Sequence, residues 1–348
     1  LDGGAGFDWA DYFGAQGSVT VNLTTGTASG GDDTDVLRNI EAVRGSDYED
    51  SLTGDGGDNW LRGNWGDDTL DGGAGFDWAD YYDATSAVTV TLTNATVAGG
   101  ATGGQSTGGD DNDILINIEA IRGSDFDDSL SGNNSDNFIR GGLGDDSLNG
   151  GDGFDWVDYR DASGAVTVNL DTGISSGLDG NDTLSNFEAI RGGDYNDSMT
   201  GNSADNWLRG GLGNDTLNGG SGNDWADYRN ASAAVSVNLA ATVIGGQTIG
   251  RSAGADGNDS LFSIENIRGG DFNDSLTGDG GDNFLRGGLG NDTLDGGAGY
   301  DWADYQDASS AVMVTLTATT ANGVTTGGGS STGGDGRDVL KNIEAVRG

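Results

Sequence analysis

The sequence predicts an all-β protein, a parallel β-roll or β-solenoid with coils of 18 residues. Three observations lead to this fold class. The 348 residues include 68 glycines and no proline, and no long window carries apolar residues at helical spacing, so packed helices are disfavoured. A long repeat of about 73 residues fills the chain, and a nine-residue repeat lies inside it. Disorder, the usual expectation for such an acidic, glycine-rich chain, conflicts with 8 Trp, 9 Tyr and 10 Phe in strict order.

The long repeat is marked by the tryptophan of a recurring "DW" pair. It returns at intervals of 69, 78, 69 and 77 residues, at Trp9, Trp78, Trp156, Trp225 and Trp302. All of the variation falls in one segment, which follows "VTVNL" in the first repeat and is therefore expected to be a surface loop. The other 55 positions admit no insertion, as in a solenoid with a locked register. We expect one continuous array over residues 1–348, with repeats at 1–69, 70–147, 148–216 and 217–293 and a partial fifth at 294–348.

The short repeat is visible when residues 45–80 are written in nines: "GSDYEDSLT", "GDGGDNWLR", "GNWGDDTLD" and "GGAGFDWAD". The pattern is G-G-x-G-x-D-x-U-x, where U is a large apolar residue. Glycine permits positive φ in a tight turn, and aspartate ends that turn. The final x-U-x forms a very short strand whose middle side chain points inward. Two turns and two strands would close one coil of 18 residues, and coils would stack at about 4.8 Å.

These units resemble the RTX, or haemolysin-type calcium-binding, repeats of secreted bacterial proteins, with five units in each long repeat. The resemblance implies a parallel β-roll with multiple structural Ca²⁺ ions between the turns of successive coils. Position-six side chains and turn carbonyls would supply the oxygen ligands. The aspartates at that position are Asp8, Asp35, Asp50, Asp68, Asp77, Asp113, Asp128, Asp146, Asp155, Asp182, Asp197, Asp215, Asp224, Asp259, Asp274, Asp292, Asp301 and Asp338. In the second unit of each block asparagine takes the place, at Asn59, Asn137, Asn206 and Asn283, and we expect a weaker or differently built site there.

The residue types themselves favour calcium. The chain has no cysteine and no histidine, which excludes the thiolate and imidazole sites of zinc and copper. Ca²⁺ accepts about six to eight oxygens in flexible geometry, whereas Mg²⁺ demands a stricter octahedron. With 57 acidic and 15 basic residues, aspartates on adjacent coils would repel without a cation between them. The alternative is that the aspartates only cap turns. About twenty such turns in register favour the metal.

The 18-residue period also sorts side chains into columns on the two faces of the strands. We expect two inward columns, one from Val43, Leu61 and Ala79 and one from Leu52, Leu70 and Val88. Outward aromatic pairs should stack on one face: Trp60 with Trp78, Phe138 with Trp156, Trp207 with Trp225, and Phe284 with Trp302. Two positions further on lies a column that holds nine of the 15 basic residues: Arg44, Arg62, Arg122, Arg140, Arg191, Arg209, Arg268, Arg286 and Arg347.

Two interpretations of this aromatic and arginine column stay open. It could be exposed and serve lateral contact or sugar binding. Alternatively, the "AVTVNL" strand or the variable segment covers it as a second small core, and Arg62 pairs with Asp80 across coils. The alternation of Val88, Val90 and Leu92 favours the second interpretation, because a half-buried strand needs an apolar partner.

Two function classes follow. The first is a calcium-stabilised structural protein, part of a bacterial surface layer, extracellular filament or long adhesin. The second is a calcium-binding accessory module of a secreted polysaccharide-acting or hydrolytic enzyme. Without histidine or cysteine, and with no carboxylate pair set apart from the repeat, catalysis is not expected, although acid chemistry by two carboxylates stays open. We favour the structural class.

The same features set the expected location and partners. We expect an extracellular protein at the bacterial cell surface. It would associate with itself along a fibre axis or continue into further repeats, with surface polysaccharide as a candidate partner. A formal net charge of −42 disfavours nucleic acid, and no apolar run approaches the length needed for membrane insertion.

Overall fold

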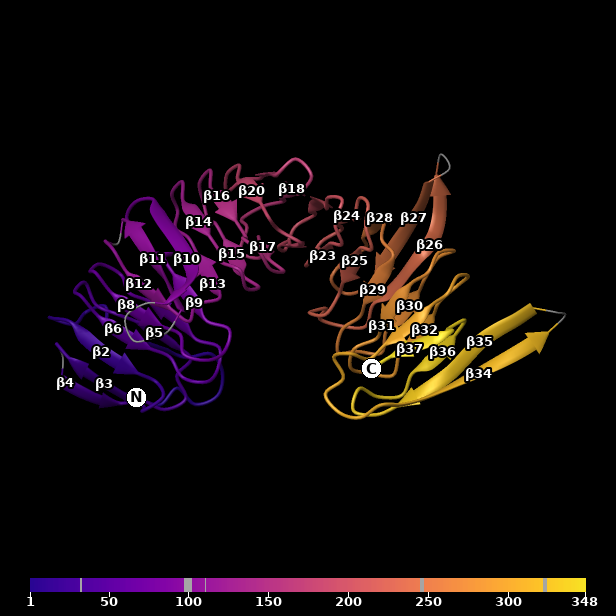
Figure 1. Ribbon diagram of the computed structural model, residues 1–348, viewed down its shortest axis with the longest axis horizontal. Coiled ribbons are helices and arrows are strands. Elements are labelled where there is room, and N and C mark those ends of the chain that lie inside the picture. Colours follow the sequence, from indigo (N-terminus) through magenta and orange to yellow (C-terminus); the bar gives the residue numbers. More distant parts are fainter. Residues whose placement is uncertain (32, 97–101, 110, 245–246, 322–323) are drawn as a thin grey trace. The chain divides into compact units, whose positions relative to one another are not determined.

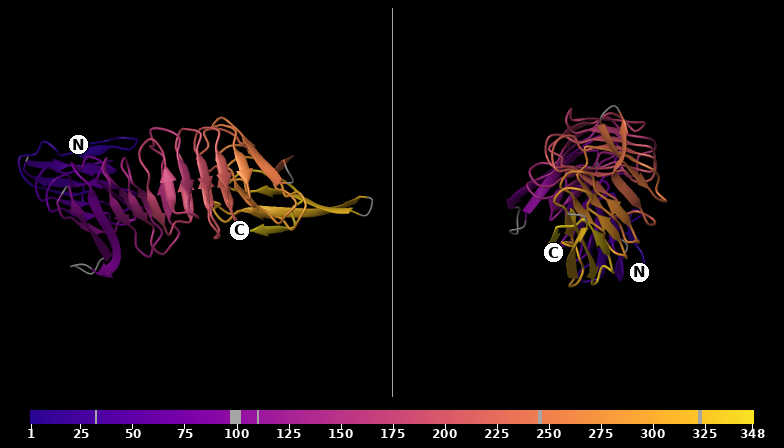
Figure 2. Two further views of the ribbon diagram at one scale, coloured as in Figure 1. Left: turned by 90° about the horizontal axis from the view of Figure 1, so that it is seen from above. Right: turned by 90° about the vertical axis from the view of Figure 1, so that its right-hand side faces the viewer.

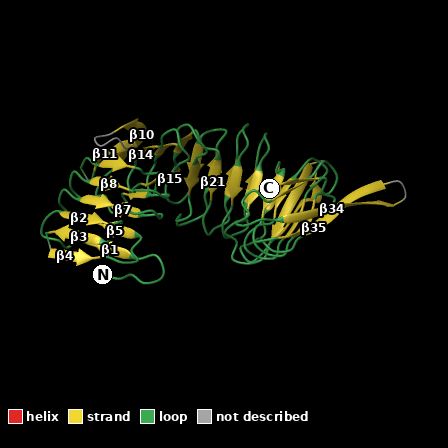
Figure 3. Ribbon diagram, turned by 60° about the horizontal axis from the view of Figure 1, so that its bottom comes forward, coloured by secondary structure: helices red, strands yellow, loops and turns green. Residues whose placement is uncertain are grey.

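The computed structural model describes residues 1–31, 33–96, 102–109, 111–244, 247–321 and 324–348. In this part of the chain all regular structure is β-strand and no helix occurs (Figure 3). The predicted all-β parallel roll is confirmed. The strands belong to two compact units: unit 1 comprises Leu1–Asp158 and Gly173–Phe187, and unit 2 comprises Tyr159–Thr172 and Glu188–Gly348. The repeat boundaries proposed from the sequence stay a prediction.

Each unit contains a parallel sheet of three-residue strands, which we call the Trp sheet (Figure 1). In unit 1 its order is β1 (Trp9–Asp11), β5 (Ala42–Arg44), β7 (Trp60–Arg62), β9 (Trp78–Asp80), β13 (Ala120–Arg122), β15 (Phe138–Arg140) and β17 (Trp156–Asp158). In unit 2 it is β21 (Ala189–Arg191), β23 (Trp207–Arg209), β25 (Trp225–Asp227), β29 (Asn266–Arg268), β31 (Phe284–Arg286), β33 (Trp302–Asp304) and β37 (Ala345–Arg347).

The second sheet of each unit mixes parallel and antiparallel pairs, and we call it the hairpin sheet. In unit 1 its spatial order is β4 (Asp33–Val36), β3 (Thr27–Gly30), β2 (Val19–Asn22), β6 (Ser51–Thr53), β8 (Thr69–Asp71), β12 (Ile114–Ile116), β11 (Thr102–Gly108), β10 (Val88–Thr96), β14 (Ser129–Ser131), β16 (Ser147–Asn149), β20 (Thr183–Ser185) and β19 (Ile174–Ser176).

In unit 2 the hairpin sheet runs β18 (Thr167–Asn169), β22 (Ser198–Thr200), β24 (Thr216–Asn218), β28 (Ser260–Phe262), β27 (Gln247–Ala253), β26 (Ser236–Ile244), β30 (Ser275–Thr277), β32 (Thr293–Asp295), β36 (Val339–Lys341), β35 (Val324–Thr332) and β34 (Met313–Ala321). Figure 2 shows β34 and β35 projecting beyond the other strands of this unit.

Within each block of nonapeptides consecutive strands alternate between the two sheets, and this alternation makes the coil. From β5 to β9 each strand begins nine residues after the last, so every second strand returns to the same sheet. Val43 pairs with Leu61, and Leu61 with Ala79, which confirms the 18-residue period. Six-residue turns connect the strands, and glycine lets them reverse the chain in so few residues.

The core lies between the two sheets and consists of the middle residue of each triplet. Val43, Leu61 and Ala79 have no exposed surface, as predicted for one inward column. The other predicted column is correct for Leu52 and Leu70 and wrong for Val88. The residue that follows Leu70 in the column is Leu115 of β12, because β12 and the antiparallel strand β11 lie between β8 and β10. Val88 is nevertheless buried, at the start of β10.

The variable segment is not a surface loop, and that expectation is wrong for its described residues. The chain leaves β9, passes to β10, returns through β11 antiparallel to it, and enters β12, which pairs with β8. The alternating valines of β10 explain this path. Val90 faces the core and lies in register with Leu130 of β14. Strand β10 therefore forms part of the hairpin sheet and is not a solvent-exposed loop.

The extra strands make the two sheets of one unit unequal. In the described part of unit 1 the Trp sheet has seven strands and the hairpin sheet twelve; in that of unit 2 the numbers are seven and eleven. Strands in any sheet lie about 4.8 Å apart, so the hairpin sheet is the longer one. Each unit must therefore curve, with its hairpin sheet on the outer side.

Candidate metal sites in the turns

The position-six residues line up in two columns of turns, one along each edge of the roll. In the Asp turn column the turns lead into the hairpin sheet. Its trios are Asp50–Asp68–Asp113, Asp128–Asp146–Asp182, Asp197–Asp215–Asp259 and Asp274–Asp292–Asp338. In the Asn turn column the turns lead into the Trp sheet. Its members are Asn59–Asp77–Glu119, Asn137–Asp155, Asn206–Asp224–Glu265, Asn283–Asp301–Glu344 and Asp8–Glu41.

One hydrogen bond links each member to the next coil. The backbone N–H of Asp128 donates to Asp146 Oδ1 at 2.8 Å, and that of Asp146 donates to Asp182 Oδ1 at 3.1 Å. Each carboxylate therefore uses one oxygen to tie its own turn to the preceding one. The hydrogen bonds of the second carboxylate oxygen divide these residues into three groups.

The first members of the Asp turn column have both oxygens engaged. Asp274 accepts from the Val235 N–H at 2.9 Å through Oδ1 and from the Gly270 N–H at 2.7 Å through Oδ2. Asp50, Asp128 and Asp197 bond in the same way. These four aspartates make the hydrogen bonds of turn caps, and their assignment as calcium ligands stays a prediction.

The last members of that column are also satisfied, by groups distant in sequence. Asp259 Oδ2 accepts from the Tyr228 hydroxyl at 2.9 Å and from the Ser252 hydroxyl at 2.8 Å. Tyr81 and Tyr305 bond Asp113 and Asp338 in the same way. The predicted ligand Asp35 lies inside β4 and accepts from the Tyr12 hydroxyl at 3.2 Å.

Six of the middle members, and Asp8 as well, are different, because each retains a buried oxygen that accepts no hydrogen bond. Asp292 is 1% exposed, and its Oδ2 has no partner. The same holds for the Oδ2 atoms of Asp146 and Asp215 in the Asp turn column, and of Asp8, Asp77, Asp224 and Asp301 in the Asn turn column. A buried carboxylate oxygen without a donor costs free energy, and a cation beside it removes that cost.

Burial raises the pKa values of six middle aspartates, three in each turn column. Desolvation is the largest cause, neighbouring carboxylates raise the pKa further, and the bond from the preceding coil lowers it. The pKa is about 8 for Asp146 and Asp292, about 7 for Asp215, and about 6 for Asp77, Asp224 and Asp301. At neutral pH Asp146 and Asp292 would be mostly protonated unless a metal ion replaces the proton, whereas the groups with a pKa of about 6 would be mostly ionised.

Glycine at the first position of the unit makes room for the same oxygens. A Cβ atom on Gly141 would lie 2.0 Å from Asp146 Oδ2, and one on Gly287 would lie 2.1 Å from Asp292 Oδ2. Gly144 in the same turn has φ of 114°, a conformation that other residues rarely adopt. The first glycine of the turn accommodates the carboxylate in the end members as well, since a Cβ atom on Gly269 would lie 2.3 Å from Oδ2 of Asp274.

The asparagines of the Asn turn column already use their amide groups within the protein. Asn283 Oδ1 accepts from the Asp279 N–H at 2.8 Å, and its Nδ2 donates to the Glu265 carbonyl at 2.7 Å. Asn59, Asn137 and Asn206 make the corresponding bonds. The structure therefore gives these four predicted ligands a cross-coil structural role.

Sequence reasoning missed the glutamates of the "NIEAVR" segments. The Glu119 carboxylate accepts from the Asp77 N–H at 3.0 Å, so Glu119 takes the place of a position-six aspartate. Glu41, Glu265 and Glu344 do the same. The sequence contained a sign of this role. E-A-V-R matches the D-x-U-x end of a nine-residue unit, and the six-residue "NIEAVR" segment is such a unit with a turn three residues shorter.

Carboxylates alone do not complete a metal site. No group of three or more acidic side chains in the described residues converges closely enough to hold an ion. A site here must combine one middle aspartate with backbone carbonyls of adjacent turns, the donor set that the repeat pattern implied. Carboxylate and carbonyl oxygens suit Ca²⁺.

The outer face of the Trp sheet carries the aromatic and arginine column. Trp60 and Trp78 stack with ring centroids 4.7 Å apart and planes 20° apart, and the other three predicted pairs stack as well. The Arg62–Asp80 pair predicted across coils is present, with Nε to Oδ2 at 3.1 Å, and Asp80 is buried. Since the "AVTVNL" strand belongs to the hairpin sheet, the idea that it covers this column is wrong. The rings instead lie face to face, and Trp78, Trp156 and Trp225 are buried.

No helix suited to crossing a membrane was found among the described residues. Comparison with protein-family models finds four copies of the RTX calcium-binding nonapeptide repeat, at residues 44–79, 122–157, 191–226 and 268–303. Each copy begins at an arginine of the Trp sheet and ends beside its tryptophan column, so it spans the first and middle members of both turn columns. A search of curated proteins found no match.

Proposed function

We propose that this chain, which contains four RTX calcium-binding nonapeptide repeats, serves as an extracellular structural element whose coils are locked together by Ca²⁺. In this proposal it forms part of a bacterial surface layer, a filament or a long adhesin. RTX repeats bind Ca²⁺ at multiple structural sites, and a repetitive fold of this kind fits a protein without catalytic activity.

The observation that carries the proposal is the recurrence of unpartnered carboxylate oxygens along both units. Each such oxygen lies in a turn that touches the next coil. A Ca²⁺ ion bound there would join two turns through carboxylate and carbonyl oxygens and would neutralise part of a formal charge of −42. Binding free energy would then be folding free energy, as in other small metal-supported folds.

The thin core makes this contribution large. One coil contributes mainly the middle residues of two triplets, such as Leu61 and Leu70, and the turns hold glycine and aspartate. Apolar burial per residue is therefore low, and ions replace part of it. A fold that needs about millimolar Ca²⁺ would assemble outside a cell, where extracellular modules of modest affinity operate.

Chelation tests the proposal directly. We expect the β signal in circular dichroism to collapse with excess chelator and to return with Ca²⁺, but not with equal Mg²⁺. Electron microscopy of the protein with and without Ca²⁺ should show extended particles, alone or associated end to end, only when Ca²⁺ is present. Equal folding in chelator and in Ca²⁺ would exclude the locking role, and compact isolated particles in Ca²⁺ would exclude the filament role.

A further inference from the structure

The turns of the Asp turn column carry large apolar side chains at their tips. In unit 1 these are Tyr48 and Trp65, both 48% exposed, and Phe126 and Leu143, which are 43% and 41% exposed. Single exposed apolar residues scattered over a surface need no explanation, whereas grouped ones mark interaction sites. The side chains of unit 1 are grouped.

They form two patches, because adjacent turns stack on one another. A Cβ atom on Gly66, the neighbour of Trp65, would lie 2.6 Å from the carbonyl carbon of Tyr48. The turns of Leu143 and Phe126 approach one another in the same way. Each patch therefore combines the tips of two successive coils.

The turn geometry does not require apolar side chains at these positions. The tips are the third and fourth residues of a turn, and in the first two turns of every trio one of them is Tyr, Trp, Phe or Leu. In the Asn turn column the same two positions hold only Gly, Ala, Ser, Asn and Asp. Those turns make the same hydrogen bond from coil to coil, so the apolar tips are not needed for the fold.

The patches of unit 1 are also surrounded by negative charge. Position five of the turn links adjacent coils, since Asp127 Oδ1 accepts from the Asp145 N–H at 2.8 Å. The four turns that carry the patches contain no basic residue. Apart from position six they contain six acidic residues, all exposed: Asp47, Glu49, Asp67, Asp125, Asp127 and Asp145.

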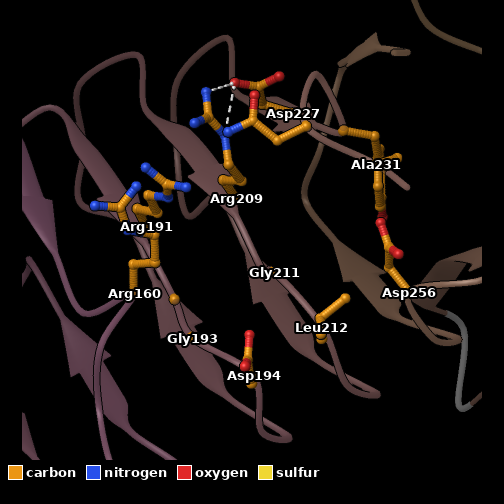
Figure 4. A pocket seen from close by; sticks show the side chains of 13 residues that line it. Arg160, Arg191, Gly193, Asp194, Arg209, Gly211, Leu212, Asp227, Ala231 and Asp256 are labelled. Atoms are coloured by element: carbon orange, nitrogen blue, oxygen red, sulfur yellow. Dashed lines mark hydrogen bonds and ion pairs between the residues drawn. The ribbon is translucent and has the colours of Figure 1, made fainter. Parts of the chain in front are cut away.

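Unit 2 has the same apolar tips with less charge. Figure 4 shows two of its turns, where the side chains of Leu212 and Asp194 lie apart from the arginines. The Asn214 N–H donates to Asn196 Oδ1 at 2.7 Å, so an amide at position five is sufficient for the link between coils. The charge at that position in unit 1 is therefore not required by the turns. The four position-five residues of unit 2 are Asn196, Asn214, Asn273 and Asn291.

We propose that the two apolar patches of unit 1 bind a basic segment of a partner protein, in which Arg or Lys side chains alternate with apolar ones. Its apolar side chains cover the exposed rings and Leu143, and its cations pair with the flanking carboxylates. Cations also bind favourably over the faces of Trp, Tyr and Phe rings. Nucleic acid and anionic membranes are repelled here, and a second copy of this chain brings the same negative charge.

The spacing of the patches sets the length of this segment. The Tyr48 turn leads into β6 and the Leu143 turn into β16, and six strand spacings of the hairpin sheet separate these strands. At about 4.8 Å per spacing, the two patches extend over about 29 Å. An extended peptide of about twelve residues spans about 40 Å and can reach both.

The test uses the full chain in Ca²⁺ and isothermal titration calorimetry at about 0.15 M salt. The probe is a peptide of about twelve residues in which Arg and Leu alternate, and the matched control alternates Arg and Gly. We expect the Arg–Leu peptide to bind at least about tenfold more tightly than the control, with an affinity that falls as salt is raised. Equal affinities would show charge attraction alone and would overturn the proposal, as would the absence of binding.

Paired serine variants locate the site. Tyr48→Ser with Phe126→Ser should weaken binding of the Arg–Leu peptide by at least about tenfold. Tyr195→Ser with Phe272→Ser makes the equivalent change in unit 2 and should alter the affinity by less than about twofold. Equal weakening by the two pairs would refute the assignment to unit 1.

A charge variant tests the role of the carboxylates. Asp127→Asn with Asp145→Asn gives unit 1 the asparagines of unit 2 and keeps the link between coils, so the bound Ca²⁺ count should not change. Peptide affinity should fall by at least about fivefold, with a weaker salt dependence. Unchanged affinity would contradict the proposal. Self-association in ultracentrifugation that Tyr48→Ser with Phe126→Ser abolishes, without peptide binding, would assign the patches to a second copy and also overturn it.

Discussion

Replacing Asp146 by Asn tests the distinction between middle and end members of a trio. Asp146 is 3% exposed, and its Oδ1 accepts from the Asp128 N–H at 2.8 Å. Its Oδ2 has no partner, and burial raises its pKa from 3.8 to about 8. Asparagine keeps the Oδ1 acceptor and the side-chain size, and it replaces the charged Oδ2 by an uncharged NH₂ group.

The expected effects have opposite signs with and without metal. In chelator at pH 9 the wild-type carboxylate is charged and buried, so its removal should stabilise any residual fold by on the order of 3 kcal/mol. In Ca²⁺ the variant loses the charged ligand of one site, so it should bind about one ion fewer and be less stable than the wild type.

The control is Asp128→Asn, at an aspartate whose two oxygens both accept backbone hydrogen bonds. An Asn amide cannot accept at its nitrogen, so one buried N–H loses its acceptor and stability should fall by about 1–3 kcal/mol in either condition. Calorimetric Ca²⁺ titration and urea unfolding measure both quantities. Equal loss of bound Ca²⁺ in the two variants would refute the assignment of the ion to the unpartnered oxygen.

Three further predictions concern protons, glycine and tyrosine. Because the folded-state pKa values of Asp146 and Asp292 are raised to about 8, the metal-free fold should gain stability as the pH falls from 8 toward 4, whereas Ca²⁺ affinity should fall over the same window. Urea midpoints in chelator and Ca²⁺ titrations at several pH values check both signs. Gly141→Ala would push a methyl group against Asp146 Oδ2, so Ca²⁺ binding should weaken with little change in other repeats; a fully retained ion count would contradict the close approach. Tyr228→Phe removes a hydroxyl that donates to Asp259 Oδ2, so unfolding free energy should fall by about 1–2 kcal/mol with the Ca²⁺ count unchanged, and a lost ion would show that Asp259 is a ligand after all.

The sequence was sufficient to predict the coil, because the information that fixes it is local. Each nine-residue unit contains its own turn glycines and its own inward residue, so the spacing of Trp60 and Trp78 already determines that they stack. The inward column of Val43, Leu61 and Ala79 follows from the same spacing. Strand pairing in register needs no information from outside the repeat.

The function of each aspartate could not be predicted in this way. Asp215 and Asp259 occupy the same position in their units, but only Asp259 meets a tyrosine hydroxyl, from Tyr228, 31 residues earlier in the chain. The burial and the donors around a carboxylate depend on loops outside the consensus. The repeat pattern therefore identifies where ligands can be, and the three-dimensional environment decides which oxygens are left for a cation.

The variable segment was misjudged for a related reason. Insertion tolerance is typical of a loop, but a hairpin that projects from a sheet tolerates it equally well. The β10–β11 pair is longer than the β2–β3 pair, and in both cases the strand that follows returns to the same register with the roll. Length changes are thus absorbed at the distal end of the hairpin, away from the turns.

Different parts of the repeat therefore determine Ca²⁺ binding and the curvature of each unit. The Ca²⁺-binding turns depend on the 55 invariant-length positions, which place one middle aspartate per column in every repeat. The hairpins add strands to one sheet only, and in each unit this makes the hairpin sheet the outer, longer side. A change in hairpin number or pairing would therefore alter the local curvature while the turn geometry stays the same, because neighbouring Trp-sheet strands such as β9 and β13 remain paired across each insertion. Deleting β10 and β11 down to the short β2–β3 form should accordingly leave the Ca²⁺ count unchanged and alter the small-angle scattering profile of the chain. A loss of bound Ca²⁺ in that variant would show that the hairpins and the metal sites are coupled.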